Sequence, residues 1–297
     1  MALPDFLIVG AAKCGTTSLY NYLSAHDEIY LNKNKEPKYF VSKILDFPLK
    51  GKGDDLTEEL MVKDFKEYKL LFEEKKPFQI TGEASVDYLF YAEEVIPQIK
   101  KCLKKDIKII IMLRNPVERA FSAYKHLLRD VRETESFEKA LELEDIRIKQ
   151  NYEFIWYYKK AGFYYKDVKL YVDNFKHVKI LSFDDFTRNT QTVLNEVFEF
   201  LGVASLSDIQ TDKIFNKTGA PKSKILQKAL TGSPDQLSRK VGRFLFPARI
   251  RNQIRDYLER KNLNDKKIVL DLKTRKELDK IYEEDLKKIK DDFGIIL

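Results

Sequence analysis

The sequence has 297 residues, of which 43% are hydrophobic and 34% are charged. This balance supplies enough apolar side chains for a large core, and the low counts of glycine (11) and proline (9) exclude collagen-like and low-complexity proteins. Two cysteines exclude a disulfide scaffold, and no apolar run approaches the ~18 residues of a membrane-spanning helix. The net charge of +7 is unevenly spread, because residues 217–261 hold twelve basic and three acidic side chains. Such a segment attracts anions, or it is a solvated helix face without a partner.

Strand and helix patterns alternate along the chain. Short apolar runs predict buried strands at residues 6–10, 29–31, 78–85, 107–113 and 178–183. Amphipathic periodicity predicts helices at residues 16–25, 92–104, 116–130, 136–144, 161–175, 187–201, 249–262 and 272–291. Residues 41–77 are charged and irregular, and we expect an excursion or lid there. The alternation predicts a single α/β domain over residues 1–297, with a central parallel sheet flanked by helices on both faces.

The segment GAAKCGTTS at residues 10–18 joins the first expected strand to the first expected helix. Its two glycines let backbone N–H groups converge, and the helix N-terminus adds partial positive charge. The hydroxyl groups that follow are further donors. The segment therefore predicts a phosphate site built from Lys13, Cys14, Gly15, Thr16, Thr17 and Ser18.

The same segment departs from the nucleoside-triphosphatase pattern G-x-x-x-x-G-K-[ST] in an informative way. Thr16 occupies the place of the pattern's lysine, and the lysine is instead Lys13, inside the loop. The strand at 107–113 is followed by Arg114, where a triphosphatase needs an acidic residue to hold Mg²⁺. These departures predict a P-loop-like sheet protein that binds a phosphate ester without a metal ion.

Two runs carry a family resemblance: IVGAAKCGTTSL at 8–19 and IMLRNPVERAFSAY at 111–124. They resemble the sulfotransferases that use 3′-phosphoadenosine-5′-phosphosulfate (PAPS), and most closely the glycan branch with the heparan sulfate N- and 3-O-sulfotransferase domains. The resemblance spans residues 6–203. It implies that the first motif binds the 5′-phosphosulfate and that the second, R-x-P-x-x-R-x-x-S-x-Y, binds the 3′-phosphate through Arg114 and Ser122. Taken without the family, Arg114 is better explained by a salt bridge to a nearby carboxylate, and Arg119 by a structural ion pair.

The resemblance also implies the chemical roles. Glu36 in EPKYF at 36–40 matches the glycan enzymes' E-x-x-[FY]-F segment, so it would deprotonate the acceptor. Lys13 would neutralise the leaving phosphate. Without the family, Glu36 is a surface charge in a lysine-rich loop. Lys38 and His126 are further candidates for contact with the acceptor.

Two features depart from the glycan branch. Ala84 replaces a lysine that several glycan enzymes use near the acceptor, which makes a heparan-like acceptor doubtful. No cysteine follows Cys102, so the disulfide-bridged loop that covers the adenine in the heparan enzymes is absent. The stretch IFNKTGAPKS at 214–223 resembles an uncrosslinked counterpart of this loop. It implies cofactor contacts from Phe215, Lys217 and Lys222.

The sequence therefore predicts a sulfotransferase that moves a sulfuryl group from PAPS to a hydroxyl or amine, with a carbohydrate as the expected acceptor and adenosine 3′,5′-bisphosphate as product. We expect no metal, no nucleic acid, no membrane span, and a bacterial-type, cytoplasmic enzyme. A kinase with a degenerate phosphate loop and a non-catalytic nucleic-acid binder that uses residues 217–261 are the alternatives. The acceptor's identity, O- or N-sulfation and the oligomeric state stay open.

Overall fold

Five parallel strands form the centre of the structure. The computed structural model describes residues 3–32, 34–206, 223, 262 and 268–297. The strand order is β2-β3-β1-β4-β5, and every neighbouring pair is parallel. The strands are β1 (Phe6–Gly10), β2 (Ile29–Leu31), β3 (Ile80–Ala84), β4 (Lys108–Leu113) and β5 (His177–Ser182). The central strand β1 and its neighbour β4 are apolar on both faces, as burial between two helical layers requires.

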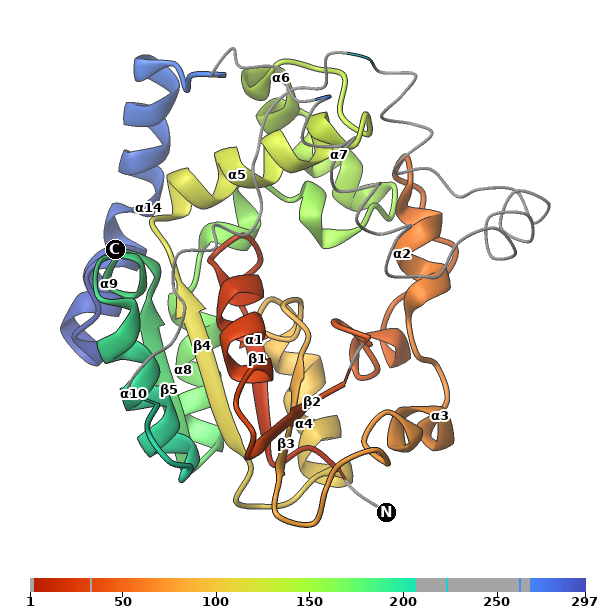
Figure 1. Ribbon diagram of the computed structural model, residues 1–297. Coiled ribbons are helices and arrows are strands. Elements are labelled where there is room, and N and C mark those ends of the chain that lie inside the picture. The colour runs from red at the N-terminus through yellow and green to blue at the C-terminus, as the bar shows by residue number, and fades with distance from the viewer. Residues whose placement is uncertain (1–2, 33, 207–222, 224–261, 263–267) are drawn as a thin grey trace.

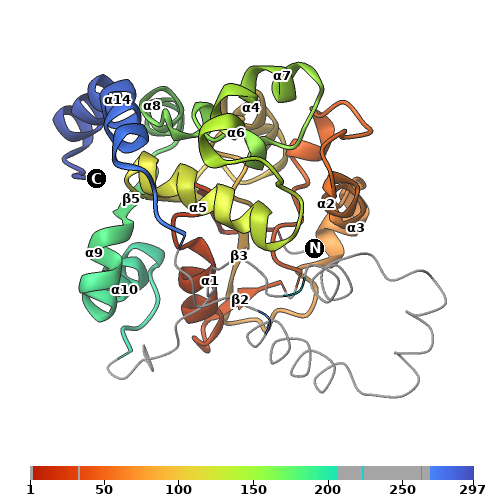
Figure 2. The ribbon, with the colours of Figure 1, turned by 90° about the horizontal axis from the view of Figure 1, so that it is seen from above.

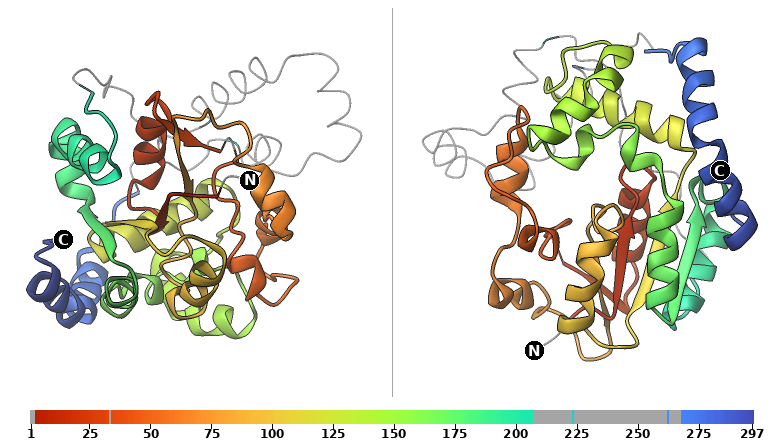
Figure 3. Two further views of the ribbon diagram at one scale, coloured as in Figure 1. Left: turned by 90° about the horizontal axis from the view of Figure 1, so that it is seen from below. Right: turned by 180° about the vertical axis from the view of Figure 1, so that it is seen from behind.

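Helices cover both faces of this sheet. α1 (Thr16–Ser24) and α10 (Thr190–Leu201) lie on one face, and α4 (Ala92–Cys102) and α8 (Tyr165–Asn174) lie on the other (Figure 1 and Figure 3). The other helices are α2 (Asp54–Leu60), α3 (Phe65–Leu70), α5 (Pro116–Arg129), α6 (Phe137–Glu142), α7 (Glu144–Lys149), α9 (Phe183–Arg188) and α14 (Leu272–Phe293), with the 3-10 helices η1 (Val41–Lys43), η2 (Phe154–Trp156) and η3 (Lys160–Gly162). The predicted α/β fold is confirmed.

A second layer crosses the carboxyl ends of the strands (Figure 1 and Figure 2). α5 begins directly after β4, because Pro116 fits the first helical turn and Asn115 Oδ1 accepts hydrogen bonds from the next N–H groups. The apolar side of α5 packs with Phe137, Trp156 and Tyr282 in a second hydrophobic core, distinct from the core around the sheet. The carboxyl edge of the sheet is therefore bounded by the sheet layer below and by α5 above.

The C-terminal helix α14 is fixed against this second layer. Leu278 and Tyr282 are buried, and the hydroxyl of Tyr282 donates to the carbonyl of Lys159 at 2.8 Å. The carboxylate of Asp285 accepts hydrogen bonds from the N–H groups of Tyr164 and Tyr165, at 2.9 and 3.1 Å. α14 thus contacts both α5 and the start of α8.

Three stretches differ from the sequence prediction or lie beyond it. Residues 41–77, where we expect an excursion or lid, hold the short helices η1, α2 and α3, which the sequence does not reveal because helices with local caps such as Asp64 have too few turns to show periodicity. The helix predicted at 187–201 is two helices, α9 and α10, which meet at Asn189. Apart from Asn262, the helix predicted at 249–262 lies outside the described residues, and the single-domain prediction stays a prediction. Within the described ranges, no helix combines the length and apolar character needed to cross a membrane.

Candidate functional site

The loop after β1 offers backbone N–H groups at the start of α1. Gly15 caps α1 at φ 89°, in the left-handed region that favours glycine, and a Cβ there would lie 2.6 Å from the ring of Phe183. The N–H groups of Ser18 and Leu19 donate to the Gly15 carbonyl. Those of Thr16 and Thr17 donate to no acceptor in the described part of the chain. Two free N–H groups and the positive end of the helix dipole therefore face the cavity above the sheet, where they suit an anion.

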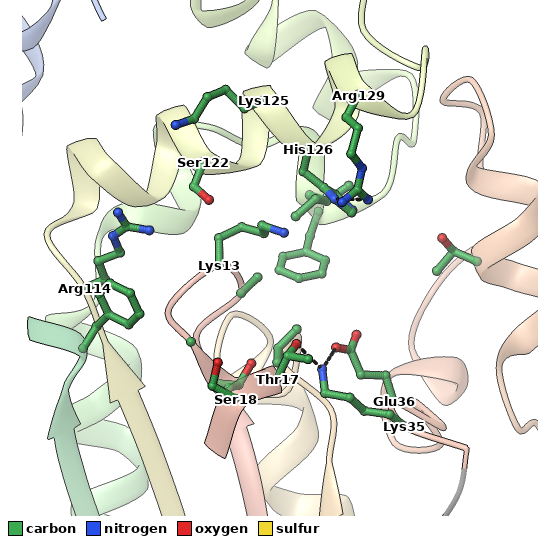
Figure 4. Close-up of a pocket in the computed structure, with 18 of the residues that line it drawn as sticks. Lys13, Thr17, Ser18, Lys35, Glu36, Arg114, Ser122, Lys125, His126 and Arg129 are labelled. Carbon is green, nitrogen blue, oxygen red and sulfur yellow. Dashed lines mark hydrogen bonds and ion pairs between the residues drawn. The ribbon is translucent and has the colours of Figure 1, made fainter. Parts of the chain in front are cut away.

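Lys13 projects from this loop into the same cavity (Figure 4). Burial lowers the pKa of the Lys13 ammonium, and the positive charge of Arg129 lowers it further, to about 8, against the opposing effect of Glu36. A lysine with this pKa is still mostly protonated at neutral pH. Because it is partly desolvated, its charge acts strongly on a phosphate placed beside it.

Arg114 and Ser122 approach the cavity from the other side. Arg114 follows β4, and its guanidinium carbon lies 4.6 Å from the centroid of the Phe183 ring. Its Nη2 lies 3.8 Å from Oε2 of Glu118, too far for a hydrogen bond. The salt bridge that is the alternative explanation for Arg114 therefore exists only as a loose ion pair with Glu118. Ser122 lies two turns into α5 and lines the same cavity. A guanidinium with open N–H groups beside a hydroxyl is suited to a phosphate.

Glu36 faces these groups across the cavity and is tied to the phosphate loop through Lys35 (Figure 4). Nζ of Lys35 donates to Oε1 of Glu36 at 2.7 Å and to the hydroxyl of Thr17 at 3.1 Å. Burial raises the pKa of Glu36, but the charges of Lys35 and Lys38 outweigh burial and hold it below its ordinary value. Glu36 is therefore an ionised carboxylate at neutral pH and can accept a proton.

Lys38 lies behind Glu36 in a cluster of carboxylates. It is 6% exposed. Its Nζ lies 3.1 Å from Oε1 of Glu153, 3.3 Å from Oδ2 of Asp87 and 3.9 Å from Oε2 of Glu36. Burial disfavours its charge, yet these carboxylates hold the pKa of Lys38 well above its ordinary value. Lys38 is thus a permanently charged group that anchors the loop carrying Glu36.

Backbone strain marks the same two loops. Lys13, Glu36 and Lys38 have φ values of 68°, 62° and 53°. Each left-handed, non-glycine residue costs about 1–2 kcal/mol, and such residues concentrate at functional sites. The strain gives a reason, independent of any motif, to place function where these two loops meet.

His126 reaches the cavity one turn beyond Ser122. Burial lowers the pKa of His126 well below the usual range, and the neighbouring charges of Lys13 and Arg129 lower it further. Its Nδ1 accepts a hydrogen bond from Nη2 of Arg129 at 3.0 Å, which leaves the proton on Nε2. His126 is therefore a neutral imidazole and a weaker base than an ordinary histidine.

These groups line one cavity of about 720 Å³ at the carboxyl edge of the sheet. Seven lysine and arginine side chains line it, against two glutamates, so the cavity favours an anionic ligand. Its size suits a nucleotide together with an acceptor group. The sequence-predicted residues that the structure brings together here are Lys13, Gly15, Thr16, Thr17, Ser18, Glu36, Lys38, Arg114, Ser122 and His126.

Other predicted residues lie elsewhere. The side chain of Cys14 is fully buried in the core, where its Sγ contacts the carbonyl of Ala12 and the hydroxyl of Tyr164, so the thiol does not reach the cavity. Arg119 is buried, and its guanidinium donates hydrogen bonds to the carbonyls of Tyr157 and Tyr158 rather than forming the predicted ion pair with an acidic side chain. Phe215, Lys217 and Lys222 lie outside the described residues.

Sequence reasoning missed several lining residues: Lys35, Lys125, Arg129, Glu153 and Phe183. Lys125 and Arg129 follow Ser122 by three and seven positions, so helical spacing alone places them on its face of α5. Phe183 directly follows β5, and residues at the carboxyl ends of parallel strands gather at one edge of the sheet. No local signal marked Glu153, which belongs to a distant loop.

The fold and the cavity together define an α/β protein with a site suited to an anionic, phosphate-containing ligand. Comparison with known families specifies the class further. Residues 3–290 match the family model described as Sulfotransferase domain. The chain belongs to this family, which confirms the prediction made from the sequence.

Relatives support the same conclusion. The crystal structure of a sulfotransferase from Alicyclobacillus acidocaldarius matches with a TM-score of 0.77 and 33% identity, over 100% of this chain and 98% of that one. Carbohydrate sulfotransferase 15 of Mus musculus is 25% identical over 82% of this chain and 51% of its own length. The bifunctional heparan sulfate N-deacetylase/N-sulfotransferase 2 of Homo sapiens is 32% identical over 42% of this chain and 13% of its own length. The chain thus spans about half the length of the first of these curated relatives and a much smaller share of the second.

Proposed function

We propose that this protein transfers a sulfuryl group from PAPS to a hydroxyl or amine of an acceptor. The observation that carries the proposal is that one basic cavity joins the phosphate loop and Lys13 to Arg114 and Ser122, with Glu36 facing them. The kinase alternative has no comparable support, because Arg114 takes the position at the end of β4 where a metal-holding carboxylate would be needed.

The part of the cavity proposed to bind the donor fits a nucleotide that carries phosphate groups at both its 5′ and 3′ positions. The free N–H groups at the start of α1, with Lys13, would hold the 5′-phosphosulfate. Arg114 and Ser122 would hold the 3′-phosphate. Phe183 also lines the cavity, with the guanidinium carbon of Arg114 4.6 Å from its ring centroid, and would supply aromatic surface near the nucleotide.

The chemistry is an in-line displacement at sulfur. The acceptor oxygen or nitrogen forms a bond to sulfur while the bond from sulfur to the bridging phosphate oxygen breaks. Glu36, ionised and held toward the cavity by Lys35, accepts the acceptor's proton. Lys13 neutralises the charge that grows on the leaving phosphate.

A carbohydrate is the proposed acceptor. The curated relatives named above are described as acting on carbohydrates or heparan sulfate. Ala84 stands where several glycan enzymes carry a lysine, so the details of acceptor contact differ from those enzymes. The cytoplasmic location and the cofactor contacts of Phe215, Lys217 and Lys222 stay predictions.

Calorimetric titration in the presence of a metal chelator tests the donor assignment. Adenosine 3′,5′-bisphosphate should bind about 10- to 100-fold more tightly than adenosine 5′-monophosphate, because a charge-assisted phosphate contact contributes about 1.5–3 kcal/mol. Equal affinity for the two nucleotides would overturn the proposal. So would a strict requirement for Mg²⁺ together with a preference for ATP.

A further inference from the structure

Glu118 on α5 is shared between two arginines from distant parts of the chain. Its Oε1 accepts a hydrogen bond from Nη2 of Arg275, on α14. Its Oε2 lies 3.8 Å from Nη2 of Arg114, beyond hydrogen-bond distance. The carboxylate of Glu118 is therefore hydrogen-bonded to Arg275 and only loosely paired with Arg114.

Arg275 is held in place by the packing of its helix. Leu278 and Tyr282, one and two turns further along α14, are buried in the second hydrophobic core. Asp285 caps the start of α8 from the same helix. The guanidinium of Arg275 is therefore presented to the first turn of α5 by a fixed element, and Glu118 has a partner on the side away from the cavity.

The pairing of Glu118 with Arg275 leaves the guanidinium of Arg114 available to a ligand. Within the described residues its guanidinium donates no hydrogen bond, and it lines the cavity with Ser122 and Lys125 (Figure 4). Figure 4 shows the side chains of these three residues directed toward one region of the cavity. Without Arg275, Glu118 is close enough to turn its carboxylate onto Arg114. A phosphate would then have to displace an internal carboxylate before it could bind.

We propose that Arg275 is a positioning residue for the donor site: it engages Glu118 and so keeps the guanidinium of Arg114 open for the 3′-phosphate. The inference rests on the proposed function, because it requires that Arg114 binds the 3′-phosphate of the donor. It makes the C-terminal helix, which contributes no lining residue to the cavity, part of donor recognition.

A double-mutant cycle tests the inference by calorimetric titration with adenosine 3′,5′-bisphosphate. Arg275→Ala should weaken binding about three- to fivefold, the range of a partly exposed ion pair of up to about 1 kcal/mol. Glu118→Gln removes the competing charge. In that background, Arg275→Ala should change the affinity by less than about 1.5-fold, because no carboxylate remains to be released.

Two controls separate this mechanism from general effects. Lys273→Ala removes one positive charge from the same helix, and its side chain pairs with Glu277 rather than Glu118. It should leave the affinity unchanged. Adenosine 5′-monophosphate, which lacks the 3′-phosphate, should bind Arg275→Ala as well as it binds the wild type. The thermal unfolding midpoint of each variant reports any loss of the packing of α14.

The outcomes are distinct. Weakening by Arg275→Ala that persists in the Glu118→Gln background, or that affects both nucleotides equally, overturns the positioning role. An unchanged affinity in Arg275→Ala overturns it too. If the wild type itself does not distinguish the two nucleotides, the proposed function fails, and the inference fails with it.

Discussion

Raising the pH from about 7 to about 9 should remove the proton from Lys13 in the free protein and weaken donor binding. Burial and Arg129 place the pKa of Lys13 at about 8, about two units below the pKa of an unperturbed lysine side chain. The group has a lowered pKa, so its charge is present below pH 8 and is lost above it. The phosphate groups of the ligand titrate near pH 6, so only about one-tenth of their last protons remains to be lost over this interval.

The size of the effect follows from the pKa. The protonated fraction of Lys13 falls from about nine-tenths at pH 7 to about one-tenth at pH 9. If only the ammonium form supports binding, the Kd of adenosine 3′,5′-bisphosphate rises about tenfold across this interval. Bound phosphate stabilises the ammonium, so the complex should take up close to one proton per ligand at pH 9.

Calorimetric titration in two buffers of different ionisation enthalpy measures both the affinity and the proton uptake. Lys13→Met should bind more weakly at pH 7 and show no further loss up to pH 9. Glu36→Gln should move the inflection to lower pH, because Glu36 raises the pKa of Lys13, and Arg129→Gln should move it to higher pH. A flat profile in the wild type, or a tenfold loss that persists in Lys13→Met, would show that the charge of Lys13 does not control donor binding.

Three further substitutions test other parts of the site. Glu36→Gln should lower kcat about 10²–10⁴-fold, the range of a general base, while donor affinity stays within about twofold, because the amide oxygen can still accept from Lys35; near-normal turnover would move the base elsewhere. Arg114→Ala should weaken adenosine 3′,5′-bisphosphate about 10- to 100-fold and adenosine 5′-monophosphate far less, and equal losses would count against the 3′-phosphate assignment. Lys38→Met should destabilise the fold by about 3–5 kcal/mol in chemical denaturation, because it leaves Asp87 buried without its cation and Glu153 with Arg132 alone. Since protonation removes a buried carboxylate charge, that loss should be smaller at about pH 5 than at about pH 8, and a loss that does not depend on pH would point to packing alone.

The central sheet could be predicted because its strands are short, continuous apolar runs. β4 reads KIIIML, with one charged residue in six, which only a strand covered on both faces accommodates. The phosphate loop and the α5 motif could be placed in one site for a related reason. Both follow adjacent parallel strands, β1 and β4, whose carboxyl ends must meet.

The acceptor side was less accessible to prediction. Lys38 was named as a candidate, but its partners Asp87 and Glu153 lie 49 and 115 residues further along the chain, and no local pattern predicts that they converge. The short helix α2 was missed because two turns give no periodicity, yet Asp54 at its start is buried against Arg132 and Trp156. Cys14 was assigned to the cofactor from its position in the motif, whereas the tight turn at Lys13 directs its side chain into the core.

Transfer of a sulfuryl group in this cavity can be observed directly. The most direct test incubates the protein with PAPS and a panel of carbohydrate hydroxyl and amine acceptors, in the presence of a metal chelator, and follows both products by mass spectrometry. We expect at least one acceptor to gain the mass of a single sulfuryl group, matched one for one by adenosine 3′,5′-bisphosphate. We expect Glu36→Gln to lose this transfer while still binding the nucleotide. Nucleotide release without any sulfated acceptor, or transfer of phosphate from ATP instead, would contradict it.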